Sequence, residues 1–257
     1  MANYPFKSRK YLVIPVILLS FLLLPAFSYN DQNRVSAAEK CQAFPETGFK
    51  VCGRFLDYWL SHGGVRQQGF PISEEFDEQN ALPPAGDGKV HKVQYFQRAR
   101  FEYHPGQGQF EVLLGLLGAE QFAAKYATPP AAIFAGAGEC FFFTETGFKV
   151  CGRFLEYWRT NGGLAQQGFP ISEVFSELNA PPPQGDGQTH LVQYFQRARF
   201  EQHLENPAPH DVLLGLLGTS QYQAKYGVKA QPLPSPVAPI APLPPPPRVG
   251  PPPTPGV

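Results

Sequence analysis

The sequence has no excess of charge of either sign, and charged residues are few. Its 257 residues include 21 Lys and Arg against 21 Asp and Glu, and charged residues make up 16% of the chain. A basic surface marks proteins that bind nucleic acids or acidic membranes, so this neutral chain argues against both partners. The hydrophobic fraction of 43% is still enough to build folded cores.

The motifs of common catalytic sites are also absent. The sequence has no G-x-S-x-G elbow, H-E-x-x-H helix, P-loop or Rossmann fingerprint. Glu74 and Glu75 form a carboxylate pair, but Val174 stands at the matching place in the second half of the chain. A reaction that needs both carboxylates would fail there. We therefore expect a protein that is not an enzyme and that uses no cofactor.

The N-terminus has the pattern of an export signal. A basic segment at 7–10 precedes an apolar stretch at 11–27, and Ala26 and Ser28 lie at the −3 and −1 places of a cleavage site. We expect residues 1–28 to be a signal peptide. The alternative is a retained signal anchor, which would be the chain's only contact with a membrane. Under both readings the remaining chain is secreted or associated with the cell envelope.

Two copies of one segment make up most of the remaining chain. Four blocks recur without change at an offset of 99 or 100 residues: ETGFKVCGRFL, QQGFPISE, VQYFQRARFE and VLLGLLG. After the second copy the chain becomes rich in proline, which predicts an extended, disordered tail. The predicted organisation is a linker at 29–40, repeat module 1 at 41–126, a linker at 127–139, repeat module 2 at 140–226 and the tail at 227–257.

Each copy is predicted to begin with a short helix. In the first copy the helix starts at Gly53 and ends at Gly63-Gly64, which supply a left-handed C-terminal position. Trp59 and its counterpart Trp158 are interpreted as core residues rather than platforms for a sugar ring. Four apolar side chains share one face by helical spacing: Phe55, Leu56, Trp59 and Leu60.

Strands are predicted after the helix. Apolar and polar residues alternate over 93–104, which indicates one strand or a bulged pair of strands. A second strand at 110–116 and a short closing helix at 119–126 complete the copy. The predicted fold class is therefore α+β, with two tandem modules of short helices and antiparallel strands.

The four cysteines have the same spacing in both copies. An even number of cysteines at repeated spacing in an exported chain indicates disulfides. Duplication favours pairing within each copy, because each module must be able to close its own bridge. The alternative, a zinc site, lacks the short C-x₂-C pairs that such sites use. The predicted structural disulfides are Cys41–Cys52 and Cys140–Cys151.

The strand at 93–104 and its repeat carry the candidate ligand site. If the polar side of this strand is exposed, its guanidinium groups can hold a carboxylate and its aromatic ring can stack on a sugar. The alternative is a cross-strand lattice of Arg and Glu that supports the fold. The residues predicted to bind ligand are Phe96, Arg98, Arg100 and Glu102, with Phe195, Arg197, Arg199 and Glu201 in the second copy.

Two histidines and one aspartate per copy also recur. We interpret the histidines as surface residues of the strand, because no nucleophile is positioned beside them. The aspartates lie between glycines, and an Asp-Gly turn accounts for them without calcium. No metal site is predicted from these residues, which are Asp87, His91 and His104 and the corresponding Asp186, His190 and His203.

The run GGVRQQGFPISEEF at 63–76 resembles the LGFP repeat of bacterial cell-wall-associated proteins. Both copies carry the turn motif, as Gly69-Phe70-Pro71 and Gly168-Phe169-Pro170. The chain departs from the family pattern because Gln68 and Gln167 replace the leading Leu, the unit is longer and each copy adds a cysteine pair. The resemblance implies an extracellular repeat that helps to attach proteins to the cell wall.

These features predict a non-catalytic exported protein that binds or attaches to a cell-wall or surface polysaccharide, either a glycan or a peptidoglycan-like polymer. One alternative is an extracellular scaffold that binds protein partners through the modules or the Pro-rich tail. A further alternative is a hydrolase of wall polymers, which the absence of catalytic motifs disfavours.

Overall fold

The computed structural model describes residues 40–83, 86–108, 111–133, 138–182 and 184–227. The predicted signal peptide, the linker before Lys40 and the Pro-rich tail after Gly227 lie outside the described residues. Within the described ranges, no helix has both the length and the apolar character needed to cross a bilayer.

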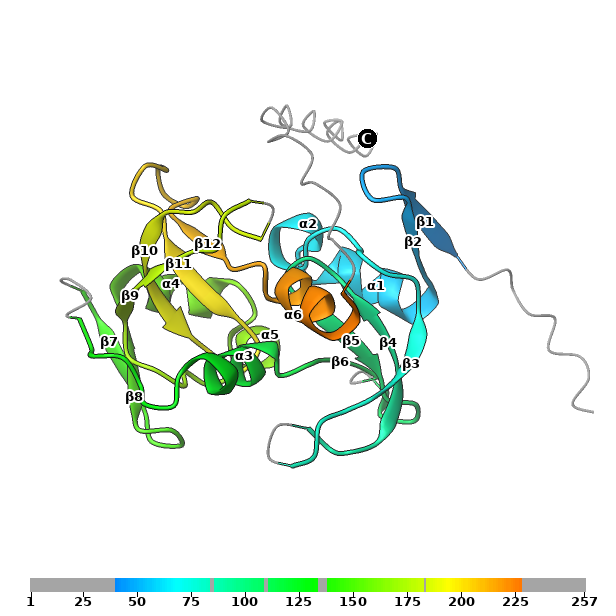
Figure 1. Ribbon diagram of the computed structural model, residues 1–257, viewed down its shortest axis with the longest axis horizontal. Helices are drawn as coiled ribbons and strands as arrows, with labels where there is room; N and C mark the ends of the chain where they lie inside the picture. Colours follow the sequence, from blue (N-terminus) through cyan, green and yellow to red (C-terminus); the bar gives the residue numbers. More distant parts are fainter. Residues whose placement is uncertain (1–39, 84–85, 109–110, 134–137, 183, 228–257) are drawn as a thin grey trace, which may run out of the picture. The chain divides into compact units, whose positions relative to one another are not determined.

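Both copies contain the same elements in the same order (Figure 1). Each has a two-stranded hairpin, two helices, a four-stranded antiparallel sheet and a final helix. The prediction of two similar modules with helices and strands is confirmed, although strands are more prominent than helices. The elements of the first copy are β1 (Cys41–Phe44), β2 (Phe49–Cys52), α1 (Gly53–Ser61), α2 (Gly64–Gln67), β3 (Phe76–Gln79), β4 (Val90–Tyr95), β5 (Arg100–Tyr103), β6 (Val112–Leu114) and α3 (Leu117–Lys125).

The second copy repeats this order with closely matching bounds. Its sheet has the order β9-β10-β11-β12, as the first has β3-β4-β5-β6. Its elements are β7 (Cys140–Phe143), β8 (Phe148–Cys151), α4 (Gly152–Thr160), α5 (Gly163–Gln167), β9 (Phe175–Leu178), β10 (Thr189–Tyr194), β11 (Arg199–Gln202), β12 (Val212–Leu214) and α6 (Leu217–Tyr226).

The first helix differs from its prediction in two details. Phe55, Leu56 and Trp59 are buried as expected, but Leu60 is 49% exposed, so its predicted burial is wrong. Leu60 lies beyond the edge of the face that packs on the sheet. Gly63 ends the helix in the left-handed region, with φ of 83°, as predicted, but a second short helix, α2, follows at once.

The alternating segment at 93–104 is a pair of strands joined by a tight turn. The amide of Phe96 donates to the carbonyl of Ala99 at 2.8 Å and closes the turn. In the resulting register Tyr95 lies opposite Arg100, and Val93 lies opposite Glu102. Directly opposed residues of an antiparallel pair share one face of the sheet. The simple alternation of apolar and polar residues along the sequence therefore does not continue across the turn. As a result, the charged residues of β5 share a face with the apolar residues of β4.

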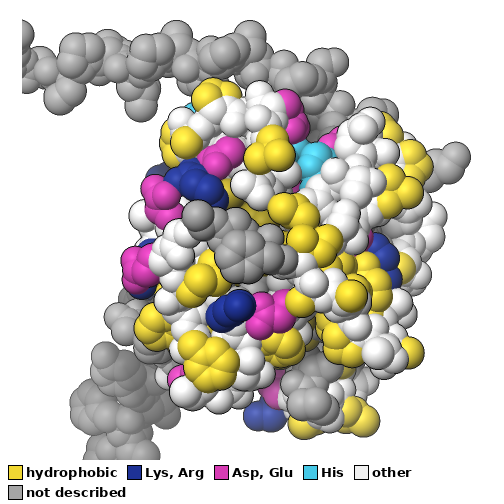
Figure 2. Space-filling model, turned by 90° about the vertical axis from the view of Figure 1, so that its left-hand side faces the viewer, with side chains coloured by type: hydrophobic (Ala, Val, Ile, Leu, Met, Phe, Trp, Pro, Cys, Tyr) yellow, Lys and Arg dark blue, Asp and Glu magenta, His cyan; other side chains and the backbone are white. Residues whose placement is uncertain are grey.

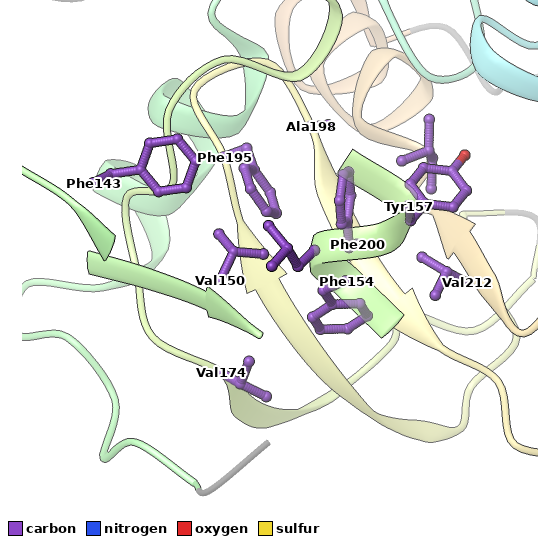
Figure 3. Packing of buried hydrophobic residues seen from close by; sticks show 11 residues of the cluster. Phe143, Val150, Phe154, Tyr157, Val174, Phe195, Ala198, Phe200 and Val212 are labelled. Carbon is purple, nitrogen blue, oxygen red and sulfur yellow. The ribbon is translucent and has the colours of Figure 1, made fainter. Parts of the chain in front are cut away.

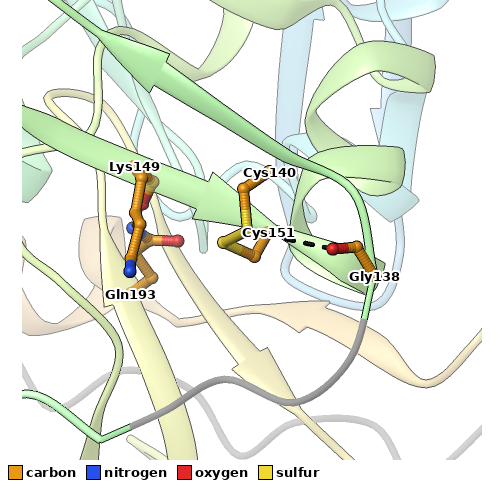
Figure 4. The surroundings of a disulfide bond; sticks show 5 residues. All are labelled: Gly138, Cys140, Lys149, Cys151 and Gln193. Atoms are coloured by element: carbon orange, nitrogen blue, oxygen red, sulfur yellow. Dashed lines mark hydrogen bonds between the residues drawn. A yellow bond between two sulfur atoms is a disulfide. The ribbon is translucent and has the colours of Figure 1, made fainter.

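The predicted disulfides are confirmed. Cys41 lies directly opposite Cys52 at the open end of the β1–β2 hairpin, and the two are bonded. Cys140 and Cys151 form the same bridge in the second copy (Figure 4). There, Gln193 donates a hydrogen bond to the Lys149 carbonyl at 2.7 Å and ties the hairpin to the sheet. Such bridges are typical of proteins that fold in an oxidising compartment outside the cytoplasm.

We expect the C140S/C151S variant to unfold more easily than the wild type. Its bridge joins residues 11 apart in sequence, and loop entropy gives a ring of this size roughly 2–3 kcal/mol of stability. Urea unfolding, with and without reductant, measures this loss. A wild type whose midpoint is unchanged by reduction would contradict the prediction.

One face of each sheet packs on the helix and hairpin of its own copy. In the second copy, Phe154 of α4 meets Phe200 of β11 with ring centroids 5.8 Å apart, and Val150 of the hairpin points into the same cluster (Figure 3). In the first copy, the corresponding residues Phe55 and Phe101 also lie 5.8 Å apart. This face is the core that the helical pattern predicted.

The other face of each sheet is covered by the final helix of the other copy. Helix α6 packs on β4, and helix α3 packs on β10. Tyr222 of α6 contacts Tyr95, with ring centroids 5.1 Å apart, and Phe122 of α3 contacts Tyr194 at the same distance. The predicted closing helices therefore exist, but each one closes the sheet of the opposite copy. The two copies complete one another's hydrophobic cores.

Candidate functional site

The strand proposed to bind ligand lies in the interior of the protein. Phe96 is fully buried, Arg100 is 2% exposed and Glu102 is 5% exposed, and their counterparts Phe195, Arg199 and Glu201 are buried as well. The expectation of an exposed aromatic beside exposed arginines is wrong. For Arg100 and Glu102 the physical reason is the exchanged helix, which covers the sheet face that would otherwise meet solvent. Phe96 is buried for another reason, because it belongs to the hydrophobic cluster of its own copy and packs on Phe101, with ring centroids 4.1 Å apart.

Arg98 and Arg197 lie where the two copies meet. The Arg98 side chain donates from Nε to the Leu214 carbonyl of the second copy, and Arg197 donates to the Leu114 carbonyl of the first, both at 3.2 Å. A second nitrogen of Arg98 bonds the Val65 carbonyl of its own copy. Both arginines therefore have backbone partners, and they join the copies.

Arg100 and Glu102 belong to a buried network of charges. The Arg100 guanidinium donates to Glu78 at 2.7 Å and to Glu102 at 2.5 Å, and it also bonds the side-chain oxygen of Asn80. Arg199 makes the same three contacts in the second copy, with Glu177, Glu201 and Asn179. This is the Arg–Glu lattice that the sequence offered as the alternative to a ligand site, extended by an asparagine and a third strand.

The network continues into the other copy. Glu78 accepts hydrogen bonds from Lys225 and Tyr226 of α6. In the same way, Lys125 pairs with Glu177 at 2.9 Å and Tyr126 donates to it. Burial by itself would raise the pKa of Glu78, but the hydrogen bonds from Tyr226 and Lys225 and the charge of Arg100 outweigh it and lower that pKa. The carboxylate is therefore held ionised where the copies meet.

The Gly-Phe-Pro motif docks on the β4–β5 turn. Gly69 has φ of +80°, and an added Cβ would lie 2.6 Å from the Cβ of Gln97. The Phe70 amide donates to the Gln97 side chain, and the Gln97 amide donates to the Phe70 carbonyl at 3.0 Å. The motif residues Phe169 and Pro170 pair with the second turn in the same way. The motif is therefore a packing element in both copies.

Gln68, which replaces the leading Leu of the LGFP pattern, is fully buried. Its amide nitrogen donates to the His62 carbonyl at 2.8 Å, at the end of α1. Gln167 donates to the matching carbonyl of Asn161, and it also reaches Gln67 of the first copy at 3.1 Å. Both glutamines donate hydrogen bonds to carbonyl groups at the end of a helix. Gln167 in addition connects the two modules.

The structure brings together one aspartate and two histidines in each copy. His91 Nε2 lies 2.9 Å from Asp87 Oδ2, and the rings of His91 and His104 have centroids 4.0 Å apart. The potential ligand atoms of all three residues lie within 4.8 Å of one another, and the same holds for the second copy. The interpretation of these histidines as surface residues is wrong for His190 and His203, which are buried. Sequence reasoning treated the three residues separately, although their common offset of 99 linked them.

A pair of exposed aromatic side chains is present in the second copy and not in the first. Phe141 and Phe142 of β7 are 48% and 59% exposed, whereas the next residue, Phe143, is buried. Figure 2 shows the side of the molecule that lies at the left in Figure 1, where hydrophobic side chains reach the surface at several places among charged ones. The matching residues of the first copy are Gln42 and Ala43.

Comparisons of the chain with protein-family models, with curated proteins and with solved structures give no match. The similarity to LGFP repeats therefore remains a prediction from the sequence motif.

Proposed function

We propose that the protein is a non-catalytic, exported binding protein that attaches to a cell-wall or surface polysaccharide. The observation that carries this proposal is the exposed aromatic pair Phe141 and Phe142. The two disulfides support a location outside the cytoplasm, and the LGFP-like turn motif is consistent with a role at the cell wall.

The aromatic pair is displayed on a rigid support. Phe141 and Phe142 are neighbours on a strand, so their rings point to opposite faces of the β7–β8 hairpin. The Cys140–Cys151 bridge closes the open end of this hairpin. A binding residue on a constrained element loses little entropy when ligand binds. Exposed aromatic rings offer a flat apolar surface to the C–H face of a sugar ring, and their burial in a complex is favourable.

The first copy provides a natural control for this surface. Gln42 and Ala43 occupy the matching strand positions without disturbing the hairpin, because Phe44 is buried there as Phe143 is in the second copy. We expect these residues in the second copy to remove the exposed rings and to keep the fold, with loss of the edge contact between Phe141 and Phe143. The reverse exchange places two aromatic rings on the first copy.

We expect the F141Q/F142A variant to lose most of its retention on purified cell walls or wall polysaccharide in a sedimentation assay. Loss of two exposed rings from a binding surface costs roughly 2–4 kcal/mol, which corresponds to a decrease in affinity of about 30-fold or more. The Q42F/A43F variant should instead bind more tightly than the wild type, because it carries two aromatic surfaces on one chain.

Retention that is equal in the wild type and F141Q/F142A would overturn the assignment to this surface. If the wild type is not retained on any wall polymer but crosslinks to a protein partner, the chain is a protein-binding scaffold and the proposed ligand class is wrong. Release of soluble fragments from labelled polymer would contradict the non-catalytic assignment.

A further inference from the structure

The cluster of one aspartate and two histidines recurs in the two copies although its surroundings have changed. Four of the six histidines of the chain belong to the two clusters. Residues next to the cluster differ in charge, size or polarity between the copies. These differing pairs are Lys89 and Gln188, Val90 and Thr189, Lys92 and Leu191, Tyr103 and Gln202, and Pro105 and Leu204.

The backbone places the three side chains together. His91 is on β4, one residue before the pair formed by Lys92 and Tyr103, and His104 directly follows β5. The two histidines are therefore opposite one another across the strand pair, on the face that also carries Glu102. Asp87 belongs to the turn that precedes β4.

Hydrogen bonds to one carboxylate oxygen of the aspartate orient its second oxygen toward the first histidine. Asp87 Oδ1 accepts hydrogen bonds from the Lys89 amide at 3.1 Å and from the Asn80 side chain at 3.3 Å, so Oδ2 is directed at His91. The second copy is built in the same way: the Gln188 amide at 3.0 Å and Asn179 at 3.1 Å hold Oδ1 of the Asp186 carboxylate. Side chains that bind metals are held in place by such outer hydrogen bonds.

The second histidine is connected to the buried network. His104 Nε2 lies 3.2 Å from Glu102 Oε2, and Glu102 is itself fixed by Arg100 and by Asn80, whose side chain donates at 2.9 Å. Asn80 thus contacts both the Asp87 carboxylate and the Glu102 carboxylate. The cluster rests on a rigid set of hydrogen bonds that reaches the contact between the copies.

We propose that each copy binds one divalent transition-metal ion through these residues: Asp87, His91 and His104 in the first copy, and Asp186, His190 and His203 in the second. Two imidazoles and one carboxylate suit Zn²⁺, Fe²⁺, Co²⁺ or Ni²⁺ better than Ca²⁺ or Mg²⁺, which prefer oxygen ligands. Three coordinating side chains leave further coordination positions on the ion for water or for a group of a bound molecule. This proposal is independent of the polysaccharide surface, which is present in one copy only.

The side chains need to move little to reach coordinating distance. Their potential ligand atoms lie within 4.8 Å of one another, whereas ligand atoms around a tetrahedral Zn²⁺ are about 3.4 Å apart, since each bond is about 2.1 Å long. Small rotations of the two imidazole rings and of the Asp carboxylate shorten these distances. Each ion would replace the present contact between Asp Oδ2 and the first histidine, while the bonds to Oδ1 remain.

The cluster of the second copy is better arranged for metal binding than that of the first. Its His203 Nδ1 lies 2.7 Å from Glu205 and its Nε2 lies 3.3 Å from Glu201 Oε2, so the ring is fixed at both nitrogens. A bound ion would take the place of the contact between Nε2 and Glu201. The site also borders a surface hollow of about 520 Å³ that His190 and Glu205 help to line. In the first copy, Gly106 follows Pro105 in the corresponding loop and brings no carboxylate. We therefore expect the second copy to bind the ion more tightly.

Isothermal titration calorimetry with Zn²⁺ tests the proposal on the exported chain, purified without a polyhistidine tag and treated with chelator. We expect about two ions per chain, with the tighter site lost in H190Q, the weaker one lost in H91Q, and both lost in H91Q/H190Q, because each substitution removes a ligand from one site. The matched control is H62Q/H210Q, which replaces the two histidines outside the clusters and should still bind two ions.

Titration with Co²⁺ adds a readout that depends on coordination. The wild type should develop visible ligand-field absorption that Zn²⁺ abolishes, and H91Q/H190Q should not, while circular dichroism shows that the variant is folded. Absence of Zn²⁺ binding by the wild type would overturn the proposal. So would unchanged binding in H91Q/H190Q, or loss of binding in H62Q/H210Q, since either result places the ion elsewhere.

Discussion

The G118A/G218A variant will be much less stable than the wild type, although alanine is ordinarily the better helix former. Gly118 and Gly218 lie in the first turns of α3 and α6, where each helix meets the other copy. An added Cβ at Gly118 would lie 1.9 Å from the Phe195 carbonyl oxygen, and one at Gly218 would lie 1.9 Å from that of Phe96. Both obstacles are backbone atoms, so a side-chain rotation cannot relieve the overlap.

The helices are also held at this place by hydrogen bonds. The Ala119 amide donates to the Gln196 carbonyl, and the Thr219 amide donates to the Gln97 carbonyl, both at 3.0 Å. A helix that shifts to make room for the new methyl group loses this bond and the packing of its aromatic side chains. Overpacking of this kind costs roughly 1–3 kcal/mol per site, and the two distant sites together should cost roughly 2–6 kcal/mol of the free energy of unfolding.

Urea unfolding of G118A, G218A and the double variant measures this effect. The control is A124G, at an exposed position of α3, which should cost about 1 kcal/mol through helix propensity alone. If the final helices were not docked on the opposite copy, Gly118→Ala would stabilise the protein by a similar amount. A stabilised G118A/G218A variant would therefore show that the exchange of helices is wrong.

The R100M variant should lose roughly 3–5 kcal/mol of stability, because it removes one partner from a buried ion network and leaves two carboxylates without their main counter-charge. Arg100 is 2% exposed and bonds both Glu78 and Glu102. Burial opposes the ionised form of Glu102, and the charge of Arg100 is the main contribution that lowers its pKa. Without the arginine, Glu102 must either take up a proton or remain buried and charged.

Two further variants give this prediction its controls. R54M breaks the Arg54–Glu111 pair, in which the Arg54 side chain is 67% exposed, and should cost less than about 1 kcal/mol. R100M/E102Q also removes one of the two carboxylate charges that R100M leaves uncompensated, so it should be more stable than R100M alone. Loss of stability by R100M no greater than that of R54M would show that the network contributes little to folding.

Several features were accessible to sequence reasoning because they depend on local or covalent order. Cys41 and Cys52 pair within one hairpin, and their repeat at Cys140 and Cys151 favoured that connectivity. Helical spacing identified Phe55, Leu56 and Trp59 as buried. Where this reasoning was wrong, at Leu60, the helical pattern was correct and only the edge of the buried face was misplaced.

The wrong expectation that the arginine-bearing strand is exposed has a specific cause. Sequence alternation sorts side chains into two faces, but it does not show what covers a face or where a turn reverses the chain. Charged residues are rarely buried unless they are paired, so Arg100 and Glu102 were expected at the surface. Their partner Glu78 is on β3 and Asn80 directly follows that strand, and the helix that covers them comes from the other copy.

The sequence by itself determined the duplication, the disulfide pairing and the presence of helices and strands in each copy, because these follow from repeated residues and short-range periodicity. Only the tertiary structure decided that the copies exchange their final helices, that the arginine-bearing strand is interior, and that Asp87, His91 and His104 meet. Each of these results depends on contacts between distant parts of the chain, which are set by strand register and by the burial of apolar surface.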